Sequence, residues 1–202
     1  MILPRPHSMV GLAAKENCQR QVLPAIYIIN TGGMGGCPSK CKFCFLNSTP
    51  VQFKLKEKYV PLLSFDEAKK VLDNIEPEFN DIYFSGMMVD ALANPDMDRI
   101  IEYAVKKYPN KLKRILTSGC LFKKERIDKW KYYPNFKIEL SLYSLDEEYR
   151  GRLFTYPNNE MIDYLLRNMK VNAVVGSLEP TSTKETIDKL MDLGHTWWYK
   201  RI

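Results

Sequence analysis

The sequence predicts an α/β fold in which six parallel strands alternate with helices, as a partial (β/α)6, TIM-like barrel. Two observations lead to this prediction. Short β-rich runs alternate with amphipathic stretches along the 202 residues, and such alternation is typical of parallel strands joined by right-handed crossovers. In two expected strands, polar and apolar residues also alternate, as they do where one face lines an interior. Six units are fewer than the eight of a closed barrel.

The strands are expected where β-branched and aromatic runs are bounded by turn residues. They are residues 25–30, 81–85, 112–117, 136–143, 171–176 and 196–200. In the fourth strand the apolar residues are Ile138, Leu140 and Leu142. The polar residues between them are Glu139, Ser141 and Tyr143. Strands covered by helices on both faces are more uniformly apolar, so this pattern favours a partial barrel over an open doubly wound sheet.

Capping residues mark the starts of the first helices. Ser64 and Glu67 have the spacing of a capping box, in which each side chain binds the other's backbone N–H. Asn94 and Pro95 are expected to be the N-cap and the first residue of the second helix. A third helix is predicted over residues 123–131.

The two remaining helices follow the fourth and fifth strands. Ser144 and Glu147 form a second capping box, and a helix with an apolar stripe is expected from about residue 158. Ser182 and Glu185 are expected to start the last helix. In total, the sequence predicts five helices, one in each connection between strands.

The composition is that of a globular domain. Hydrophobic residues make up 45% and charged residues 27% of the chain. The uncharged run over residues 21–39 contains prolines and glycines, and its apolar part is far shorter than the ~20 residues of a bilayer span. The first residues lack the layout of a signal peptide. We therefore expect a cytoplasmic protein without a membrane partner, with one core domain over residues 23–202 and an extension over residues 1–22.

Three of the five cysteines form a Cys-x3-Cys-x2-Cys motif in a glycine-rich loop after the first strand. They are Cys37, Cys41 and Cys44, and their thiolates are one ligand short of a tetrahedral zinc site or a [4Fe–4S] cluster. A missing ligand leaves an open position, which indicates chemistry at the metal. The alternative is a structural zinc site completed by Cys18, His7 or Cys120.

With Phe43 before its third cysteine, this motif resembles that of the radical S-adenosylmethionine (radical SAM) superfamily, and the resemblance extends over roughly residues 23–202. It implies that Cys37, Cys41 and Cys44 bind three irons of a [4Fe–4S] cluster, whose fourth iron binds SAM. It also implies that one electron cleaves SAM to methionine and a 5′-deoxyadenosyl radical, which abstracts hydrogen from a substrate. A flavodoxin- or ferredoxin-like protein would donate the electron.

The resemblance further implies SAM contacts at the ends of strands. Gly86-Met87-Met88 stands where the family usually has Gly-Gly-Glu, so that Met87 replaces the second glycine, and the acidic residue is lacking unless Asp90 substitutes for it. The segment from Asn172 to Glu179 resembles the family pattern G-x-I-x-G-x-x-E, with Asn for the first glycine and Val for isoleucine. The expected SAM-binding residues are Phe43, Ser85, Gly86, Met87, Ser141, Tyr143, Val174, Gly176 and Glu179.

The substrate stays open at this level. Cys18 and Cys120 are too few for a second [4Fe–4S] cluster, which disfavours subfamilies with auxiliary clusters. Residues 104–202 carry 19 basic and 12 acidic side chains, and this excess gives some support to a nucleic acid or phosphate-bearing substrate. Peptides and small metabolites are alternatives. Other readings are a non-catalytic zinc- or cluster-binding module, a glycyl-radical-enzyme activase, and a radical SAM fold that binds SAM without cleaving it.

Overall fold

A computed structural model describes residues 25–30, 37–44, 62–76, 78–86, 89–176 and 180–199. Cys18 and His7, and the two expected SAM contacts Met87 and Glu179, lie outside the described residues. Within the described part, no helix combines the length and the apolar composition that crossing a bilayer requires.

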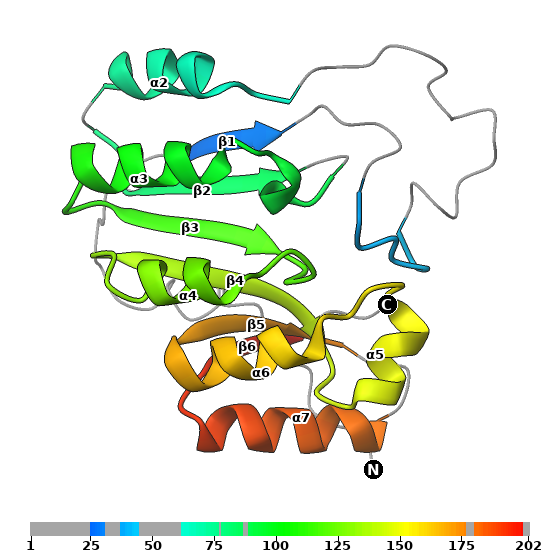
Figure 1. The fold of residues 1–202 in the computed structure, drawn as a ribbon. Helices are drawn as coiled ribbons and strands as arrows, with labels where there is room; N and C mark the ends of the chain where they lie inside the picture. The colour runs from blue at the N-terminus through cyan, green and yellow to red at the C-terminus, as the bar shows by residue number, and fades with distance from the viewer. Residues whose placement is uncertain are drawn as a thin grey trace, which may run out of the picture.

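Six strands form one parallel sheet whose spatial order follows the chain (Figure 1). They are β1 (Ile26–Asn30), β2 (Asp81–Gly86), β3 (Leu112–Thr117), β4 (Phe136–Tyr143), β5 (Val171–Val175) and β6 (Thr196–Tyr199). Each expected strand agrees with the observed one to within a residue at either end. A doubly wound sheet reverses its strand order at a switch point, whereas this order runs from β1 to β6 without reversal. The predicted α/β class and partial (β/α)6 arrangement are confirmed.

The helices cover the outer face of the sheet, as α3, α4 and α6 show in Figure 1. The α-helices are α2 (Phe65–Asp73), α3 (Met97–Lys107), α4 (Lys124–Trp130), α5 (Glu147–Leu153), α6 (Asn159–Asn168) and α7 (Pro180–Asp192), and a 3-10 turn, η2, spans Ala91–Ala93. The expectation of one helix in each connection is wrong between β4 and β5, where α5 precedes α6. The last helix begins at Pro180, two residues before the expected Ser182.

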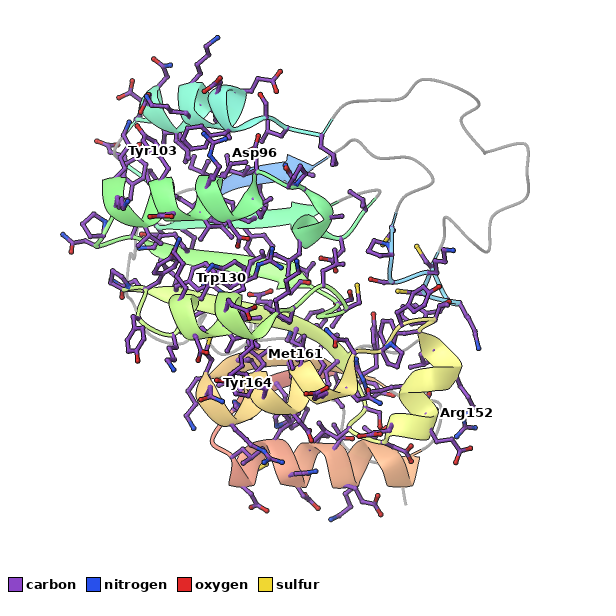
Figure 2. The ribbon with its side chains drawn as sticks, in the orientation of Figure 1. Asp96, Tyr103, Trp130, Arg152, Met161 and Tyr164 are labelled. Carbon is purple, nitrogen blue, oxygen red and sulfur yellow. The ribbon has the colours of Figure 1, made fainter. Side chains whose placement is uncertain are left out.

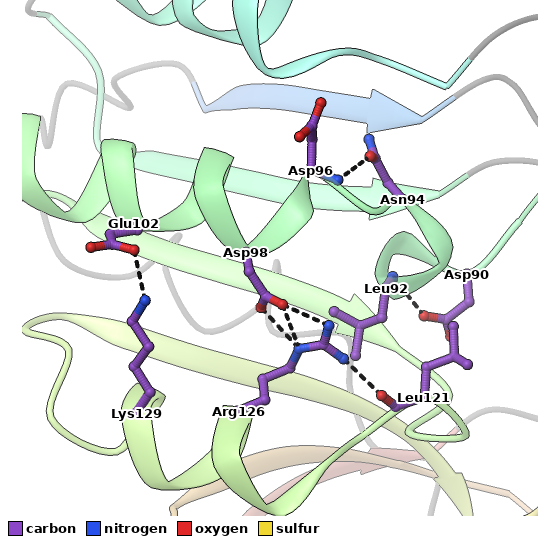
Figure 3. Close-up of polar contacts among 9 residues, drawn as sticks. All are labelled: Asp90, Leu92, Asn94, Asp96, Asp98, Glu102, Leu121, Arg126 and Lys129. Carbon is purple, nitrogen blue, oxygen red and sulfur yellow. Dashed lines mark hydrogen bonds and ion pairs between the residues drawn. The ribbon is translucent and has the colours of Figure 1, made fainter.

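The first capping prediction is confirmed and the second is wrong. Ser64 and Glu67 form both hydrogen bonds of the capping box at the start of α2. Asn94, by contrast, ends η2, and α3 begins only at Met97 with Asp96 as its N-cap. The side chain of Asn94 accepts a hydrogen bond from the Asp96 N–H at 2.9 Å (Figure 3). It also donates one to the carbonyl of Leu63. Asn94 therefore orders the turn before the helix instead of starting it.

The capping box expected at Ser144 and Glu147 is also wrong. Asp146 is the N-cap of α5, and its carboxylate accepts a hydrogen bond from the Tyr149 N–H at 2.8 Å. Ser144 instead accepts a hydrogen bond from the Asp146 N–H at 3.0 Å. Because aspartate is as good an N-cap as serine, the acid two residues further on takes this role.

The core lies between the sheet and the helices. Alternate residues of β2, β3 and β4 that face the helices, such as Phe84, Ile115 and Leu140, are fully buried. Trp130 of α4 packs among them, and Tyr103 extends from α3 toward α2 (Figure 2). The alternating apolar residues of the strands thus form one apolar layer under the helices.

The opposite, inner face of the sheet is polar, as the alternation in β4 predicts. Tyr83 of β2 donates a hydrogen bond to Glu139 of β4. Between them on β3, the guanidinium of Arg114 pairs with Asp81 at 2.8 Å and with Glu139 at 3.3 Å. Burial and the Glu139 carboxylate raise the pKa of Tyr83, which keeps its hydroxyl protonated as a donor. Charged and hydroxyl groups therefore line the interior beneath the carboxyl ends of the strands.

Candidate functional site

The cysteine loop, residues 37–44, lies against the segment that follows α5 (Figure 1). The Lys42 N–H donates to the carbonyl of Leu153 at 2.9 Å. The Thr155 N–H donates to the carbonyl of Ser39 at 3.2 Å, and the Thr155 hydroxyl donates to the carbonyl of Lys40 at 3.2 Å. These bonds seat the loop after β1 beside the carboxyl end of β4, the edge at which barrel enzymes build their active sites.

Phe43 anchors the loop through aromatic packing. Its ring meets those of Tyr143 and Phe154 edge-on, at centroid distances of 4.8 and 5.8 Å. Tyr143 and Phe154 also contact Val174 of β5, and Cys41 packs against this cluster. The aromatic side chains thus exclude water from one side of the cysteines.

Tyr143 ends β4 with a left-handed backbone, at φ +63°. This conformation is rare for a bulky residue and costs roughly 1–3 kcal/mol. It coincides with an irregular register between β4 and β5, and the Tyr143 carbonyl accepts a hydrogen bond from the Gly176 N–H at 3.1 Å. The strained residue therefore joins the ends of β4 and β5 next to the cysteine loop.

Arg150 supports the turn after β4 from the protein interior. Nothing in the sequence predicts this role. It is 2% exposed, and its guanidinium donates to the carbonyls of Leu142 and Pro157 and to the side chain of Asn159. The guanidinium also lies 5.1 Å from the centroid of the Phe154 ring. Burial lowers the pKa of Arg150 to about 10, which leaves it a cation at neutral pH. It fixes the turn after β4 on which Phe43 packs.

The three cysteines of the motif are half-buried thiols that form no disulfide. Burial, and to a lesser degree charge repulsion from the nearby Cys37, Cys44 and Cys120, raises the pKa of Cys41 to about 12. Metal binding relieves such repulsion, because it releases the thiol protons and supplies positive charge.

The donor set of this loop, three cysteine thiols within eight residues, suits an iron–sulfur cluster. Among the described residues, no three His, Cys, Asp or Glu side chains converge as ligands of one metal ion. Thiolates of a [4Fe–4S] cluster bind separate irons and need not meet at one point. Cys37, Cys41 and Cys44 are therefore suited to three corners of such a cluster.

On its other side, the cysteine loop contacts a network of hydroxyl groups that the sequence does not predict. Ser39, between the first two cysteines, lies 2.6 Å from Ser118 and 2.9 Å from Cys120, measured from its Oγ to their Oγ and Sγ. Ser118 in turn donates to Asp90 at 2.7 Å. The only sequence signal is the run Thr117-Ser118-Gly119-Cys120 at the end of β3, where side chains of a parallel sheet commonly reach a site.

The expected SAM contacts lie on several neighbouring strands. Tyr143, Val174 and Gly176 are brought together with Phe43 beside the cysteine loop. Ser141 is half-buried on the inner face of β4. Ser85 and Gly86 end β2, which is separated from β4 by β3.

Gly86 lies so close to the backbone of Val89 and Ala91 that no side chain would fit there. A Cβ there would lie 1.7 Å from the carbonyl oxygen of Val89. Close backbone approach of this kind requires glycine. The glycine shared with the expected family motif therefore has a steric reason in this chain.

Comparisons with known proteins agree with the motif and the fold. The family model of the Radical SAM superfamily matches residues 33–194. SuiB of Streptococcus suis bound to S-adenosylmethionine superposes with a TM-score of 0.67 at 14% identity, over 89% of this chain and 41% of that chain. Native anSMEcpe with bound AdoMet gives 0.60 at 16% identity, over 88% and 51%. Methylornithine synthase (PylB) gives 0.61 at 13% identity, over 89% and 53%.

No curated protein matches the sequence. The chain spans about two fifths to one half of the solved structures that it resembles, and at these identities the likeness concerns the fold. The family model, in contrast, covers most of the chain, including all three cysteines of the motif. The chain belongs to the radical SAM superfamily.

Proposed function

We propose that this protein is a radical SAM enzyme, with a [4Fe–4S] cluster held by Cys37, Cys41 and Cys44. The observation that carries the proposal is the position of the three-cysteine loop at the carboxyl edge of the parallel sheet, where its Phe43 packs against Tyr143 and Phe154. When bound, the cluster and SAM supply reductive cleavage to methionine and a 5′-deoxyadenosyl radical that abstracts hydrogen from an organic substrate.

The chain's own groups prepare the site for this chemistry. The thiols of the motif give up their protons on metal binding, and the aromatic cluster keeps water from one side of them. We propose that Ser85, Gly86, Ser141, Tyr143, Val174 and Gly176 contact SAM, together with Phe43, Met87 and Glu179. Phe43, Tyr143, Val174 and Gly176 meet beside the cysteine loop, which supports this. Residues 23–202 would form the core domain and residues 1–22 an extension.

The electron donor and the substrate are parts of the same proposal. A flavodoxin- or ferredoxin-like donor in the cytoplasm fits the low potential that a cluster of this type requires. A peptide is the substrate class to test first, because SuiB has been solved bound to its precursor peptide SuiA and anSMEcpe with a bound peptide. Nucleic acid is supported only by the excess of basic residues in the second half of the chain.

The decisive experiment is anaerobic reconstitution with iron and sulfide, followed by SAM and dithionite and detection of 5′-deoxyadenosine by mass spectrometry. The wild-type chain should bind about four irons and form 5′-deoxyadenosine. Cys41→Ala should lose both properties, whereas Cys120→Ser, outside the motif, should keep its iron. Zinc in the purified protein without 5′-deoxyadenosine would overturn the proposal and favour a structural zinc module.

A further inference from the structure

A buried chain of side chains connects the cysteine loop to β3 and to the turn before η2. It begins at Ser39, which is 1% exposed and lies midway between Cys37 and Cys41. It continues through Ser118, 79 residues away in the sequence, and ends at the carboxylate of Asp90. Nothing in the proposed chemistry requires these hydroxyl groups, so their burial beside the cluster ligands needs another explanation.

The carboxylate of Asp90 fixes one end of the chain. It accepts hydrogen bonds from the backbone N–H groups of Leu92 and Ser118, at 2.9 and 2.7 Å (Figure 3 shows the first). It also accepts from the hydroxyls of Thr117 and Ser118, at 2.9 and 2.7 Å. Four donors from two segments hold this acceptor in one place.

Proton counting then gives the chain a single direction. An ionised carboxylate only accepts, and each hydroxyl has one proton to donate. Ser118 therefore donates to Asp90, and Ser39 donates to Ser118 across 2.6 Å. The proton of Ser39 is then used, so the Cys120 thiol donates to Ser39 across 2.9 Å. The Ser118 hydroxyl also lies 3.2 Å from the Cys120 sulfur, but its one proton is directed at Asp90.

Ser39 is held from a second direction by its backbone. Its carbonyl accepts a hydrogen bond from the Thr155 N–H, in the segment after α5. The side chain is thus tied to β3 and the main chain to the neighbourhood of β4. Because both attachments lie between the first two cysteines of the motif, a displacement of Ser39 would move both thiols.

We propose that Ser39 is a positioning residue for the cluster: the chain from Asp90 through Ser118 holds it, and Ser39 in turn sets the placement of the Cys37 and Cys41 thiols before a cluster binds. The consequence for the cluster rests on the proposed function. The positioning of the loop itself does not, so the two can be tested separately.

The first test uses the full-length chain without iron. The rate of alkylation of Cys37 and Cys41 by iodoacetamide is measured by mass spectrometry under anaerobic, reducing conditions, relative to the same protein in urea. Ser39→Ala should raise both rates about tenfold, as expected when local opening loses a buried hydrogen bond. Ser118→Ala should give a similar rise, and the double variant should add little to either, because the two residues act through one chain.

The matched control is Ser64→Ala, the same substitution at the N-cap of α2. It lowers overall stability by a comparable amount, so a rise in alkylation caused by general destabilisation would appear in this variant too. Equal rates in Ser39→Ala and Ser64→Ala would overturn the positioning role. Additive effects of the Ser39 and Ser118 substitutions would contradict the inference that these two side chains act through one series of hydrogen bonds.

The second test uses the reconstituted protein. Ser39→Ala should release iron to a chelator about tenfold faster than the wild type and should change the electron paramagnetic resonance spectrum of the reduced cluster, whereas Ser64→Ala should match the wild type. Unchanged release and an unchanged spectrum would refute the inference while leaving the proposed function intact. A wild-type chain that takes up no iron would refute the proposed function, and the alkylation rates would still decide on the positioning role.

Discussion

Replacing Gly86 with alanine should force the end of β2 away from the backbone of Val89. The added Cβ would lie 1.7 Å from the carbonyl oxygen of Val89, 2.8 Å from its carbonyl carbon and 3.1 Å from the Ala91 nitrogen. All three are backbone atoms, so no side chain can rotate away to make room. An ordinary carbon–oxygen contact is about 3.3 Å, and the two backbone segments would have to move apart by roughly 1.5 Å.

The free-energy cost of this displacement can be estimated from other substitutions that force extra atoms into a packed site. Extra carbon atoms forced into packed sites typically cost ~1–3 kcal/mol, and here the strained atoms belong to the segment that carries Asp90. Loss of one hydrogen bond to that carboxylate adds ~1 kcal/mol. We expect a total loss of about 3 kcal/mol in the free energy of unfolding, or a fall of about 6–12 °C in Tm for a chain of this size.

Gly151→Ala is the matched control. A Cβ at Gly151, on the exposed side of α5, would meet no atom within 4 Å. Alanine in a helix is favoured over glycine by ~0.5–1 kcal/mol, so this variant should be slightly more stable than the wild type. Urea unfolding followed by circular dichroism measures both. If Gly86→Ala proved as stable as Gly151→Ala, the backbone would adapt freely, and the steric explanation for Gly86 would be wrong.

Two further predictions concern the stability of the fold. Trp130→Ala should lower the free energy of unfolding by ~3–5 kcal/mol, because Trp130 is 1% exposed and packs edge-on against Phe136, with ring centroids 5.0 Å apart. Urea titration measures this loss, and a value below ~1 kcal/mol would contradict the prediction. Hydrogen bonds from Lys106 and Lys129 lower the pKa of Glu102 from 4.5 to about 2, so its stabilising contribution is complete above pH ~4.5 and is lost as the pH falls toward 2. Replacing both lysines with methionine should flatten the acid dependence of unfolding in that range, and an unchanged slope would argue against the linkage.

The strands could be predicted closely because their signals are local. In β4, alternation alone separates the buried Ile138 and Leu140 from Glu139 on the inner face. Each such run is bounded by turn residues within the sequence itself. Right-handed crossovers leave few strand orders, and the polar inner face of β4 favours the barrel-like order over a doubly wound sheet.

Helix starts were harder to predict because neighbouring polar residues compete for the cap. Asp96 and Asp146 start α3 and α5, although Asn94 and Ser144 have equally good capping side chains. Which residue wins depends on tertiary contacts, such as the bond from Asn94 to the Leu63 carbonyl. Sequence spacing carries no information on such contacts.

The candidate site shows the same difference between local sequence signals and contacts that form only in the fold. The three-cysteine motif is contiguous and could be recognised directly. Ser39, Arg150 and the left-handed Tyr143 could not, because their roles arise from contacts between distant segments and from a backbone angle. His195 is buried; its Nδ1 accepts a hydrogen bond from the Val171 N–H at 3.4 Å, whereas its buried Nε2 has no hydrogen-bond partner among the described residues.

The seating of the cysteine loop also constrains when the metal site can form during synthesis of the chain. The loop lies near the N-terminal end, but the bonds that hold it reach Ser118 and Thr155, 79 and 115 residues later. A ribosome releases the cysteines long before these partners emerge. The nascent thiols therefore wait without their scaffold, and iron delivered at that stage would meet an unformed site. On the proposed function, insertion of the cofactor should therefore follow the synthesis of β4 and α5.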